Sequence, residues 1–291
     1  MVALLQRLFG WTGDDSGAGL YGNYRLLDRI AIGRLSTLYR GEHVRTGEVV
    51  ALKVLSEYGC RVADKLTRKL HKDWEGERGL KLQHPNVVRT IACGKEHEVY
   101  YLVMEYLAGG NLASLLQARA PTIEGRRIEV MRQAARGLEY VHSRGVIHRD
   151  ICLRNVMLAG DGTAKLIDFG VAADRGDRIR DTGFRTGRPA YMAPELIRTN
   201  RFDERTDLYA FGIALYEVAC GQKPYRTTDD PYQMLATVLN TEVPPPSRLR
   251  PSLSKRLERV ILRAIEPRRE ARFASVTELL DALEHVTEDD L

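Results

Sequence analysis

The chain has 291 residues, of which 44% are apolar and 29% charged, so it is long enough to bury the core of one large domain or two small ones. Charges of both signs are mixed along the sequence, which excludes a disordered tail, a collagen-like fibre and a coiled-coil rod. The net charge of +5 is small for this length. We therefore expect a solvated surface with a slight excess of arginine and no nucleic-acid partner.

The four cysteines lie far apart in the sequence and form neither a CxxC pair nor a Cys/His cluster with zinc spacing. We expect reduced thiols and a cytoplasmic protein. No run approaches the roughly 18 apolar residues that a membrane span needs. Residues 1–11 are apolar with one arginine. We interpret them as a terminal tail, and contact with a membrane is the less favoured interpretation.

From its N-terminus the chain first predicts a flexible joiner and then strands. Residues 12–23 are rich in glycine and aspartate, which is typical of a linker. Short, partly apolar or aromatic runs, rich in β-branched residues, then predict strands at 25–32, 38–43, Val49–Leu55 and 99–106.

After Gly110 the pattern becomes helical. Apolar residues at three- and four-residue steps predict a helix over 128–141, and 208–220 is apolar nearly all round, which predicts a buried helix. A last stripe over 276–283 follows Ser275 and Glu278, which have the spacing of a capping box. The pattern therefore favours a small strand-rich lobe followed by a larger helical lobe.

Several short motifs stand in an order that chance does not readily produce. They are Lys53 in the strand Val49–Leu55, then His148-Arg149-Asp150 with Asn155 five residues after the Asp, then Asp168-Phe169-Gly170 thirteen residues beyond Asn155, then Ala193-Pro194-Glu195. At these spacings the sequence resembles the protein-kinase catalytic domain, in the form found in bacteria and eukaryotes. The resemblance covers residues 24–286.

This resemblance implies an α+β, bilobal fold. Its N-lobe, about residues 24–106, is a small antiparallel β-sheet with one helix, and its C-lobe, about 107–286, is larger and mainly helical. Residues 1–23 are then an N-terminal tail and linker, and 287–291 a C-terminal tail. The implied activity is transfer of the ATP γ-phosphoryl group to Ser/Thr hydroxyls of protein substrates, with ATP and Mg²⁺ as cofactors.

The residue types suit that chemistry. Phosphoryl transfer needs the phosphates held still, their charge neutralised and the acceptor hydroxyl aligned. The resemblance implies that Lys53 contacts the α- and β-phosphates and that Asp150 accepts a hydrogen bond from the substrate hydroxyl. It also implies that Asp168 and Asn155 bind magnesium, for which hard oxygen ligands are suited. As isolated residues, these Asp and Asn side chains would be interpreted as caps or turns.

A lysine at this place needs an acidic partner. Glu75 lies nine residues before His84, the distance usual in the family, and Glu77 is the alternative. Either could instead be a solvated helix charge. Gly76 and Gly79 share the helix, and each costs about 1 kcal/mol relative to alanine. We hypothesise that a loose helix depends on a partner or on homodimer formation to seat Glu75 against Lys53.

The nucleotide pocket follows from the resemblance alone. The family pattern G-x-G-x-x-G-x-V is represented only by its middle glycine, Gly33, with Ala31 and Ser36 at the other two glycine positions. Small residues still allow the backbone to approach phosphate, although alanine does not favour positive φ. The implied ATP contacts are Ile32, Gly33 and Leu38 of the loop, Ala51 and Met157 on the apolar walls, Met104 as gatekeeper, and Glu105 to Leu107 as the hinge.

The second lobe carries further marks of the family. The resemblance implies that Glu195 pairs with Arg272. It also implies that Asp207 anchors the loop that carries Asp150, the catalytic loop. A buried carboxylate persists only when it is paired or hydrogen-bonded. The segment Ala193-Pro194-Glu195 favours a protein substrate over a small molecule.

Two residues depart from the Ser/Thr-kinase pattern. Cys152 stands where Lys is usual, and Arg188 where Thr is usual. Because a positive charge near the transferring phosphate stabilises the transition state by several kcal/mol, we hypothesise that Arg154 or Arg188 supplies it. Arg154 lies four residues after Asp150, where many tyrosine kinases have an arginine. Tyr191, in contrast, stands where tyrosine kinases usually have tryptophan, so this part of the sequence resembles the Ser/Thr kinases. We favour Ser/Thr specificity over tyrosine or dual specificity.

In the family, an arginine just before the catalytic Asp, here Arg149, usually implies control by phosphorylation of the activation segment, which lies between Asp168 and Glu195. We therefore expect autophosphorylation of Thr182 or Thr186. The alternative is an arginine-rich loop that is merely solvated. A pseudokinase that binds nucleotide and partners without efficient transfer remains the second hypothesis, and a small-molecule kinase is the third. The presence of Lys53 and Asp168 favours the active enzyme.

Overall fold

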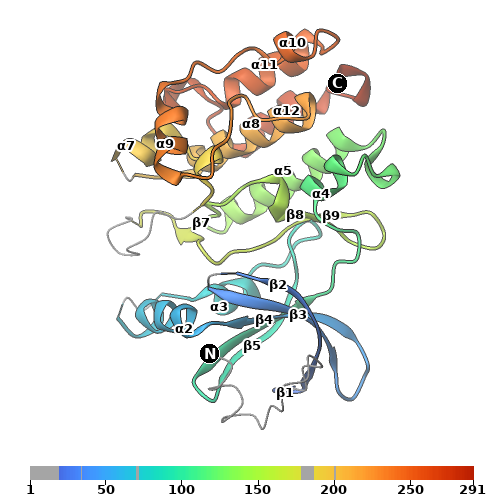
Figure 1. Cartoon of the computed structure of the whole chain (residues 1–291), viewed down its shortest axis with the longest axis vertical. Helices are drawn as coiled ribbons and strands as arrows, with labels where there is room; N and C mark the ends of the chain where they lie inside the picture. The colour runs from blue at the N-terminus through green and yellow to red at the C-terminus, as the bar shows by residue number, and fades with distance from the viewer. Residues whose placement is uncertain (1–19, 34, 70–71, 178–186, 200) are drawn as a thin grey trace. The chain divides into compact units, whose positions relative to one another are not determined.

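The computed structural model describes residues 20–33, 35–69, 72–177, 187–199 and 201–291, which Figure 1 shows coloured along the chain. The chain folds into two compact units. The first runs to Gln83 and includes Val88–Leu107; the second holds His84–Val87 and Ala108–Leu291. Each unit has its own core and its own share of the candidate site residues.

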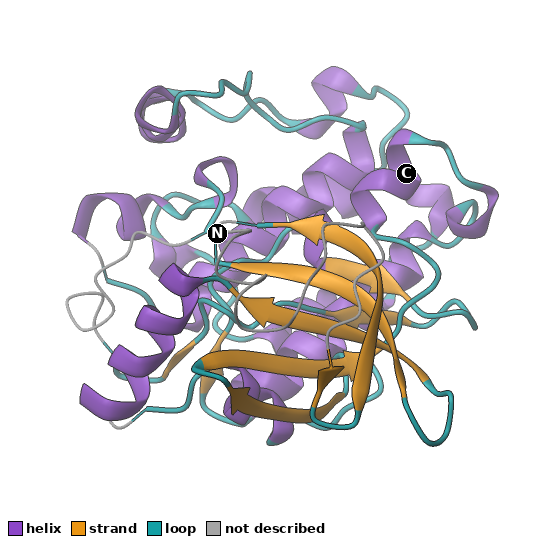
Figure 2. Cartoon of the chain, turned by 60° about the horizontal axis from the view of Figure 1, so that its bottom comes forward, coloured by secondary structure: helices purple, strands orange, loops and turns teal. Residues whose placement is uncertain are grey.

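An antiparallel sheet forms the body of the first unit. Its described strands run in the order β1-β2-β3-β4-β6-β5 and appear in orange in Figure 2. Their bounds are Leu20–Tyr21 (β1), Tyr24–Ile32 (β2), Ser36–His43 (β3), Val49–Leu55 (β4), Thr90–Glu96 (β5) and Val99–Glu105 (β6). Because side chains alternate along a strand, Val50 and Leu52 of β4 enter one buried cluster while Lys53 lies on the opposite face.

Helices cover one face of this sheet. Helix α2 (Glu57–Asp64) begins at Ser56, whose side chain accepts the N–H of Gly59 at 3.1 Å, and continues into the π-helical turn η1 (Lys65–Lys69). The short helix α3 (Glu75–Leu80) follows. Cys60, Ala63 and Trp74 pack with Tyr100 and Leu102 of β6 in a second buried cluster, so both helices are held to the sheet by apolar contact.

The second unit is mainly helical. Its helices are α4 (Leu112–Gln117), α5 (Arg127–Ser143), α7 (Pro194–Thr199), α8 (Glu204–Cys220), α9 (Pro231–Asn240), α10 (Pro246–Leu249), α11 (Lys255–Ala264) and α12 (Val276–Glu284). Its short strands are β7 (Val146–Ile147), β8 (Val156–Leu158), β9 (Ala164–Leu166) and β10 (Ala173–Asp174), and its 3-10 turns are η2 (Pro121–Ile123), η3 (Leu153–Asn155), η4 (Pro189–Tyr191), η5 (Arg269–Ala271) and η6 (Glu288–Asp290).

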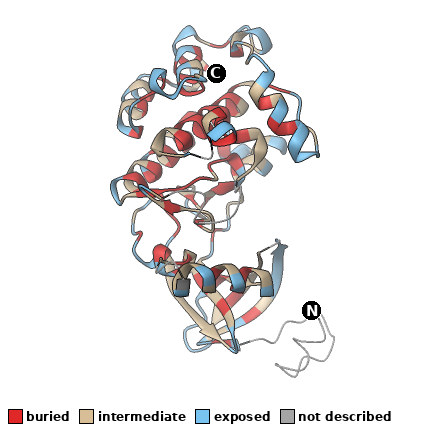
Figure 3. Cartoon of the chain, turned by 90° about the vertical axis from the view of Figure 1, so that its left-hand side faces the viewer, coloured by how far each residue is buried: buried red, intermediate tan, exposed pale blue. Residues whose placement is uncertain are grey.

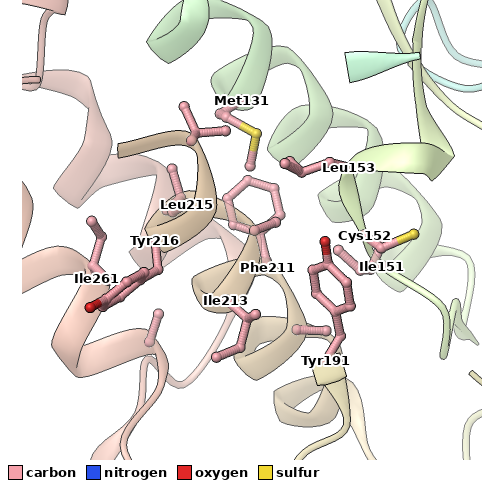
Figure 4. Close-up of a cluster of buried hydrophobic side chains, with 14 of the residues drawn as sticks. Met131, Ile151, Cys152, Leu153, Tyr191, Phe211, Ile213, Leu215, Tyr216 and Ile261 are labelled. Carbon is pink, nitrogen blue, oxygen red and sulfur yellow. The ribbon is translucent and has the colours of Figure 1, made fainter. Parts of the chain in front are cut away.

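Helix α8 is the centre of this unit. It is buried nearly all round, as Figure 3 shows in red, which confirms the interpretation of its apolar sequence. Figure 4 shows Phe211 among the core side chains, with Met131 of α5 and Leu153 of the catalytic loop near its ring. The core therefore lies directly behind the loop that carries Asp150.

A buried ion pair closes the second unit. Arg272 donates to both carboxylate oxygens of Glu195 at 2.7 and 2.8 Å, and its remaining donors reach the carbonyl oxygens of Arg205, Glu266 and Pro267. Its side chain is 0% exposed. A buried charge of this kind is tolerated because every donor has an acceptor. The pairing that the family resemblance implied is present.

The α+β fold class is confirmed, and the strand predicted at Val49–Leu55 has those bounds in the structure. Strand β5 and helix α2 were not predicted. Ser275 caps α12 as expected, but Glu278 accepts the N–H of Ala274 instead of closing a box on Ser275 itself.

The last residues of the chain, expected to be a tail, include η6, where Glu288 binds Arg127 and the N–H of Ile128. No helix in the described part of the chain is both long and apolar enough to cross a membrane. Residues 1–11, for which a tail and a membrane contact were weighed, lie outside the described residues.

Candidate active site

Lys53 and Glu75 form a close ion pair in the first unit. Lys53 Nζ donates to Glu75 Oε1 at 2.7 Å and to Oε2 at 2.8 Å. The two side chains are only 15% and 11% exposed, so water screens the pair little. The ammonium group is therefore held at one point on the face of β4. Glu75, not Glu77, is the partner that the structure provides.

Glu77 has a different task. Its Oε2 accepts the backbone N–H of Trp74 at 3.3 Å, just before the first turn of α3. The ring of Trp74 meets that of Tyr100 edge to face at 5.0 Å, which fixes the start of the helix on β6. These contacts place Glu75, the first residue of α3, above Lys53.

The glycines of α3 permit close packing. A Cβ atom on Gly76 would lie 2.5 Å from the ring of Trp74 and 2.7 Å from Cys93 Cβ, and one on Gly79 would lie 2.3 Å from Thr90 Oγ1. Side chains at these positions would push α3 away from β5. The need for glycine at these positions thus comes from close packing, which helix propensity alone did not indicate.

The loop between β2 and β3 is tied to its surroundings by backbone hydrogen bonds. Gly33 N–H donates to Ser36 O at 2.8 Å, and Ser56 N–H donates to Leu35 O at 2.8 Å. The second bond joins the loop to the start of α2. Ala31 pairs with Leu38 across the two strands. The structure thus closes the turn with the one glycine that matches the family pattern.

The predicted adenine contacts fall in both units. Ala51 lies opposite Met104 in the pairing of β4 with β6. Glu105 ends β6, and its Oε1 accepts the N–H of Arg89 at 2.7 Å. Leu107 is buried, whereas Ile32 is 67% exposed. Met157 lies on β8 in the second unit.

Asp150 is held by Asn155 in the second unit. Asn155 Nδ2 donates to the backbone oxygen of Asp150 at 2.7 Å and to its Oδ2 at 2.8 Å. Both amide hydrogens are used, so the amide oxygen is the atom of this side chain that would be available to a metal ion. Burial raises the pKa of Asp150, while the positive charge of Arg188 opposes that rise.

Asp207 of α8 fixes the backbone just before Asp150. Its Oδ2 accepts the N–H of His148 and the ring Nε2 of His142, and its Oδ1 accepts the N–H of Arg149, all at 2.8 Å. Burial alone would raise the pKa of Asp207, but hydrogen bonds and charge from His142, His148 and Arg149 lower it overall. The anchoring role implied for Asp207 is thus visible as three hydrogen bonds. No sequence motif had indicated a role for His142.

The segment that carries Asp168 lies against the same loop. Ile167 N–H donates to Asn155 O at 3.0 Å, and the ring of Phe169 lies 4.9 Å from that of His148. Asp168 itself has a φ of 68°, in the left-handed region, and its Oδ1 accepts the N–H of Gly170 at 3.3 Å. Asn155 and Asp168 therefore offer one amide oxygen and one carboxylate on adjoining segments.

This donor set fits magnesium. Mg²⁺ prefers oxygen ligands, and it is held by one or two carboxylates together with substrate phosphates instead of an all-protein cage. Among the described residues, no group of three or more His, Cys, Asp or Glu side chains is arranged to hold a metal ion. Asp168 and Asn155 would thus hold the ion with help from the nucleotide.

Arg188, and not Arg154, adjoins Asp150. Arg188 Nη1 lies 3.2 Å from Cys152 Sγ, and its charge acts on the Asp150 carboxyl. Arg154 is exposed on η3. Burial raises the pKa of Cys152 to about 12, so its thiol stays protonated and unreactive. The geometry favours Arg188 as the cation near the transferring group.

A family model described as protein kinase domain matches residues 24–285. The chain is 34% identical over 270 residues to serine/threonine-protein kinase Pkn1 of Myxococcus xanthus, covering 90% of this chain and 38% of that protein. It is 31% identical over 271 residues to a probable serine/threonine-protein kinase of Clostridium acetobutylicum (93% and 41%) and 30% identical over 267 residues to PknB of Mycobacterium tuberculosis (89% and 42%).

With a match over most of its length, the chain belongs to the protein kinase domain family. It spans less than half the length of the three relatives named above.

The packing of α3 predicts the effect of an added methyl group. Gly76→Ala should lower the free energy of unfolding by about 1–3 kcal/mol through overpacking, although helix propensity alone favours alanine by about 1 kcal/mol. Urea unfolding followed by tryptophan fluorescence measures this. Gly160→Ala is the matched control, because a Cβ there meets nothing within 4 Å. A Gly76→Ala protein more stable than wild type would contradict the packing account.

Proposed function

We propose that this domain transfers the γ-phosphoryl group of ATP to serine or threonine hydroxyls of proteins. The observation that carries the proposal is the geometry of Asp150, whose carboxylate and backbone oxygen are both held by Asn155. Family membership and the names of the relatives support the same reaction, and those names favour Ser/Thr over tyrosine acceptors.

Bound Mg²⁺ would neutralise and orient the phosphates of ATP, with Asp168 and Asn155 as its protein ligands. Lys53 would add a fixed positive charge at the phosphates, because Glu75 holds its ammonium in place. A group that is already positioned loses little entropy when the substrate binds. The catalytic power then comes from placement and charge.

Asp150 would orient the acceptor hydroxyl. Its Oδ2 is engaged by Asn155, so Oδ1 is the oxygen that accepts the hydrogen of the incoming alcohol. The positive charge of Arg188 opposes the rise in the pKa of Asp150 that burial causes, and it therefore favours the ionised form of this carboxyl. The same guanidinium would face the developing negative charge of the transfer.

Further proposals concern partners, location, autophosphorylation and homodimer formation. ATP, Mg²⁺ and protein substrates are the expected partners, and a cytoplasmic location would supply the first two. Autophosphorylation of Thr182 or Thr186 remains a prediction, since both residues lie outside the described part of the chain. Homodimer formation, which the glycines of α3 suggested, also remains a prediction.

The direct test is transfer of labelled phosphate from Mg-ATP to matched Ser, Thr and Tyr peptides. Asp150→Asn should reduce kcat by at least about 100-fold and leave nucleotide affinity nearly unchanged. Asp168→Asn should instead weaken Mg-ATP binding. Asp281→Asn, an exposed carboxylate on α12, is the control and should behave as wild type. A wild-type protein that binds Mg-ATP but labels no peptide and not itself would favour a pseudokinase.

The charge of Arg188 predicts a shift in pH dependence. Without it the carboxylate of Asp150 is less stabilised, so the pKa of Asp150 rises further and the acid limb of kcat/KM moves to higher pH. Arg188→Gln should therefore lose activity at a higher pH than wild type as the pH falls. Arg154→Gln should leave the acid limb in place. The reverse pattern would show that Arg154 is the cation that acts on Asp150.

A further inference from the structure

A large cavity lies within the second unit. It measures about 1110 Å³ and is lined by parts of α4, η2 and η3, by the residues of η4, by the end of α8 and by the start of α9. Apolar side chains such as Leu116 and Met234 form part of the wall. All lining residues belong to one compact unit, so the cavity does not depend on how the two units are placed.

The charge of the lining is unbalanced. Six basic side chains contribute to it, and three acidic ones. The basic residues are Arg119, Arg127, Arg154, Arg188, Lys223 and Arg250. A concave surface lined mainly by one sign of charge concentrates the opposite sign, because low-dielectric walls focus the field. The cavity therefore favours an anionic occupant.

One of the three acidic residues already has hydrogen-bond and ion-pair partners among the other lining residues. Glu217 accepts the hydroxyl of Tyr191, and its other oxygen lies 2.7 Å from Lys223 Nζ. The two others, Glu124 and Asp229, are exposed. Among the basic residues, Arg119 and Arg154 are exposed and form no ion pair with any described residue. Lys223 is thus paired with Glu217, and Arg127 is paired with Glu288 outside the lining. The basic residues that remain outnumber Glu124 and Asp229, so the lining keeps a net positive charge.

The cavity adjoins the loop of Asp150. Cys152, Leu153 and Arg154 line it and follow Asp150 by two to four residues. Arg188 also lines it, and its charge reaches the Asp150 carboxyl. A chain segment with its hydroxyl at Asp150 therefore has neighbouring side chains at this cavity. That continuity favours a peptide over a separate anionic ligand.

We propose that the cavity selects protein substrates with acidic residues near the phosphorylated serine or threonine. This inference rests on the proposed kinase function and names its substrate class. Carboxylates of the substrate meet the guanidinium groups of Arg119 and Arg154, and the satisfied Glu217 adds little repulsion. Basic flanking residues are disfavoured, because they meet like charge on most of the wall.

The test uses peptides that differ only beside one central threonine. Four positions on either side hold glutamate, glutamine or arginine, with separate peptides for the two sides. The expected kcat/KM for a glutamate peptide is about five- to tenfold above the glutamine peptide, the effect of one or two partly screened ion pairs. The arginine peptides should be the poorest substrates. High salt should shrink the differences.

A variant that lacks two positive charges of the cavity is compared with a control variant that lacks one positive charge elsewhere. Arg119→Gln/Arg154→Gln should bring the glutamate-to-glutamine ratio close to one. Arg259→Gln removes an exposed arginine of α11 outside the cavity and should leave the ratio as in wild type. Thermal unfolding of each variant shows that the fold is intact. A wild-type ratio near one, or a preference for arginine, would overturn the proposal.

A binding measurement separates this proposal from the kinase function. Fluorescence anisotropy with labelled peptides reports affinity whether or not phosphate is transferred. Phosphorylation of all peptides at equal rates and equal affinities would sink the charge preference and leave the kinase function standing. Tighter binding of glutamate peptides without transfer to any peptide would sink the kinase function and support an acid-selective cavity. Equal binding without transfer would overturn both.

Discussion

The buried carboxylate of Asp207 is the constraint on which the catalytic loop depends. Arg149, immediately before Asp150, has a φ of 67°, a conformation that costs an L-residue about 1–2 kcal/mol. Asp207 offsets this cost by accepting the N–H groups of His148 and Arg149, and the ring of His142 satisfies it further. Because α8 is buried nearly all round, packing in the core holds the anchor in place. The orientation of Asp150 is thus set from the core.

The two departures from the usual Ser/Thr pattern compensate each other. Cys152 brings no charge to the loop, and its thiol is protonated. Arg188 places a guanidinium against that sulfur and acts on Asp150 from there. The positive charge that a lysine at position 152 would bring is therefore supplied by Arg188, just before η4. This arrangement favours an active enzyme over a scaffold and also extends positive charge into the neighbouring cavity.

Much of the fold followed from the sequence, because alternation, helical periodicity and motif spacing are local signals. Val49–Leu55 and the buried helix α8 were predicted on that basis. What was missed depends on contacts between distant residues. Gly76 was judged by helix propensity, whereas its need arises from the folded positions of the Trp74 ring and of Cys93 on the neighbouring strand. The choice between Arg154 and Arg188 was left open for the same reason, since only the folded backbone brings residue 188 beside Cys152.

Hydrogen exchange at the amides of His148 and Arg149, measured together with the transfer rate, tests this account most directly. In Asp207→Asn one carboxylate oxygen becomes an amide nitrogen that cannot accept a hydrogen bond. The account predicts faster exchange at one or both amides and a matching fall in kcat, with the rest of the second unit still protected. Unchanged exchange and an unchanged transfer rate in that variant would show that Asp207 does not hold the catalytic loop in place.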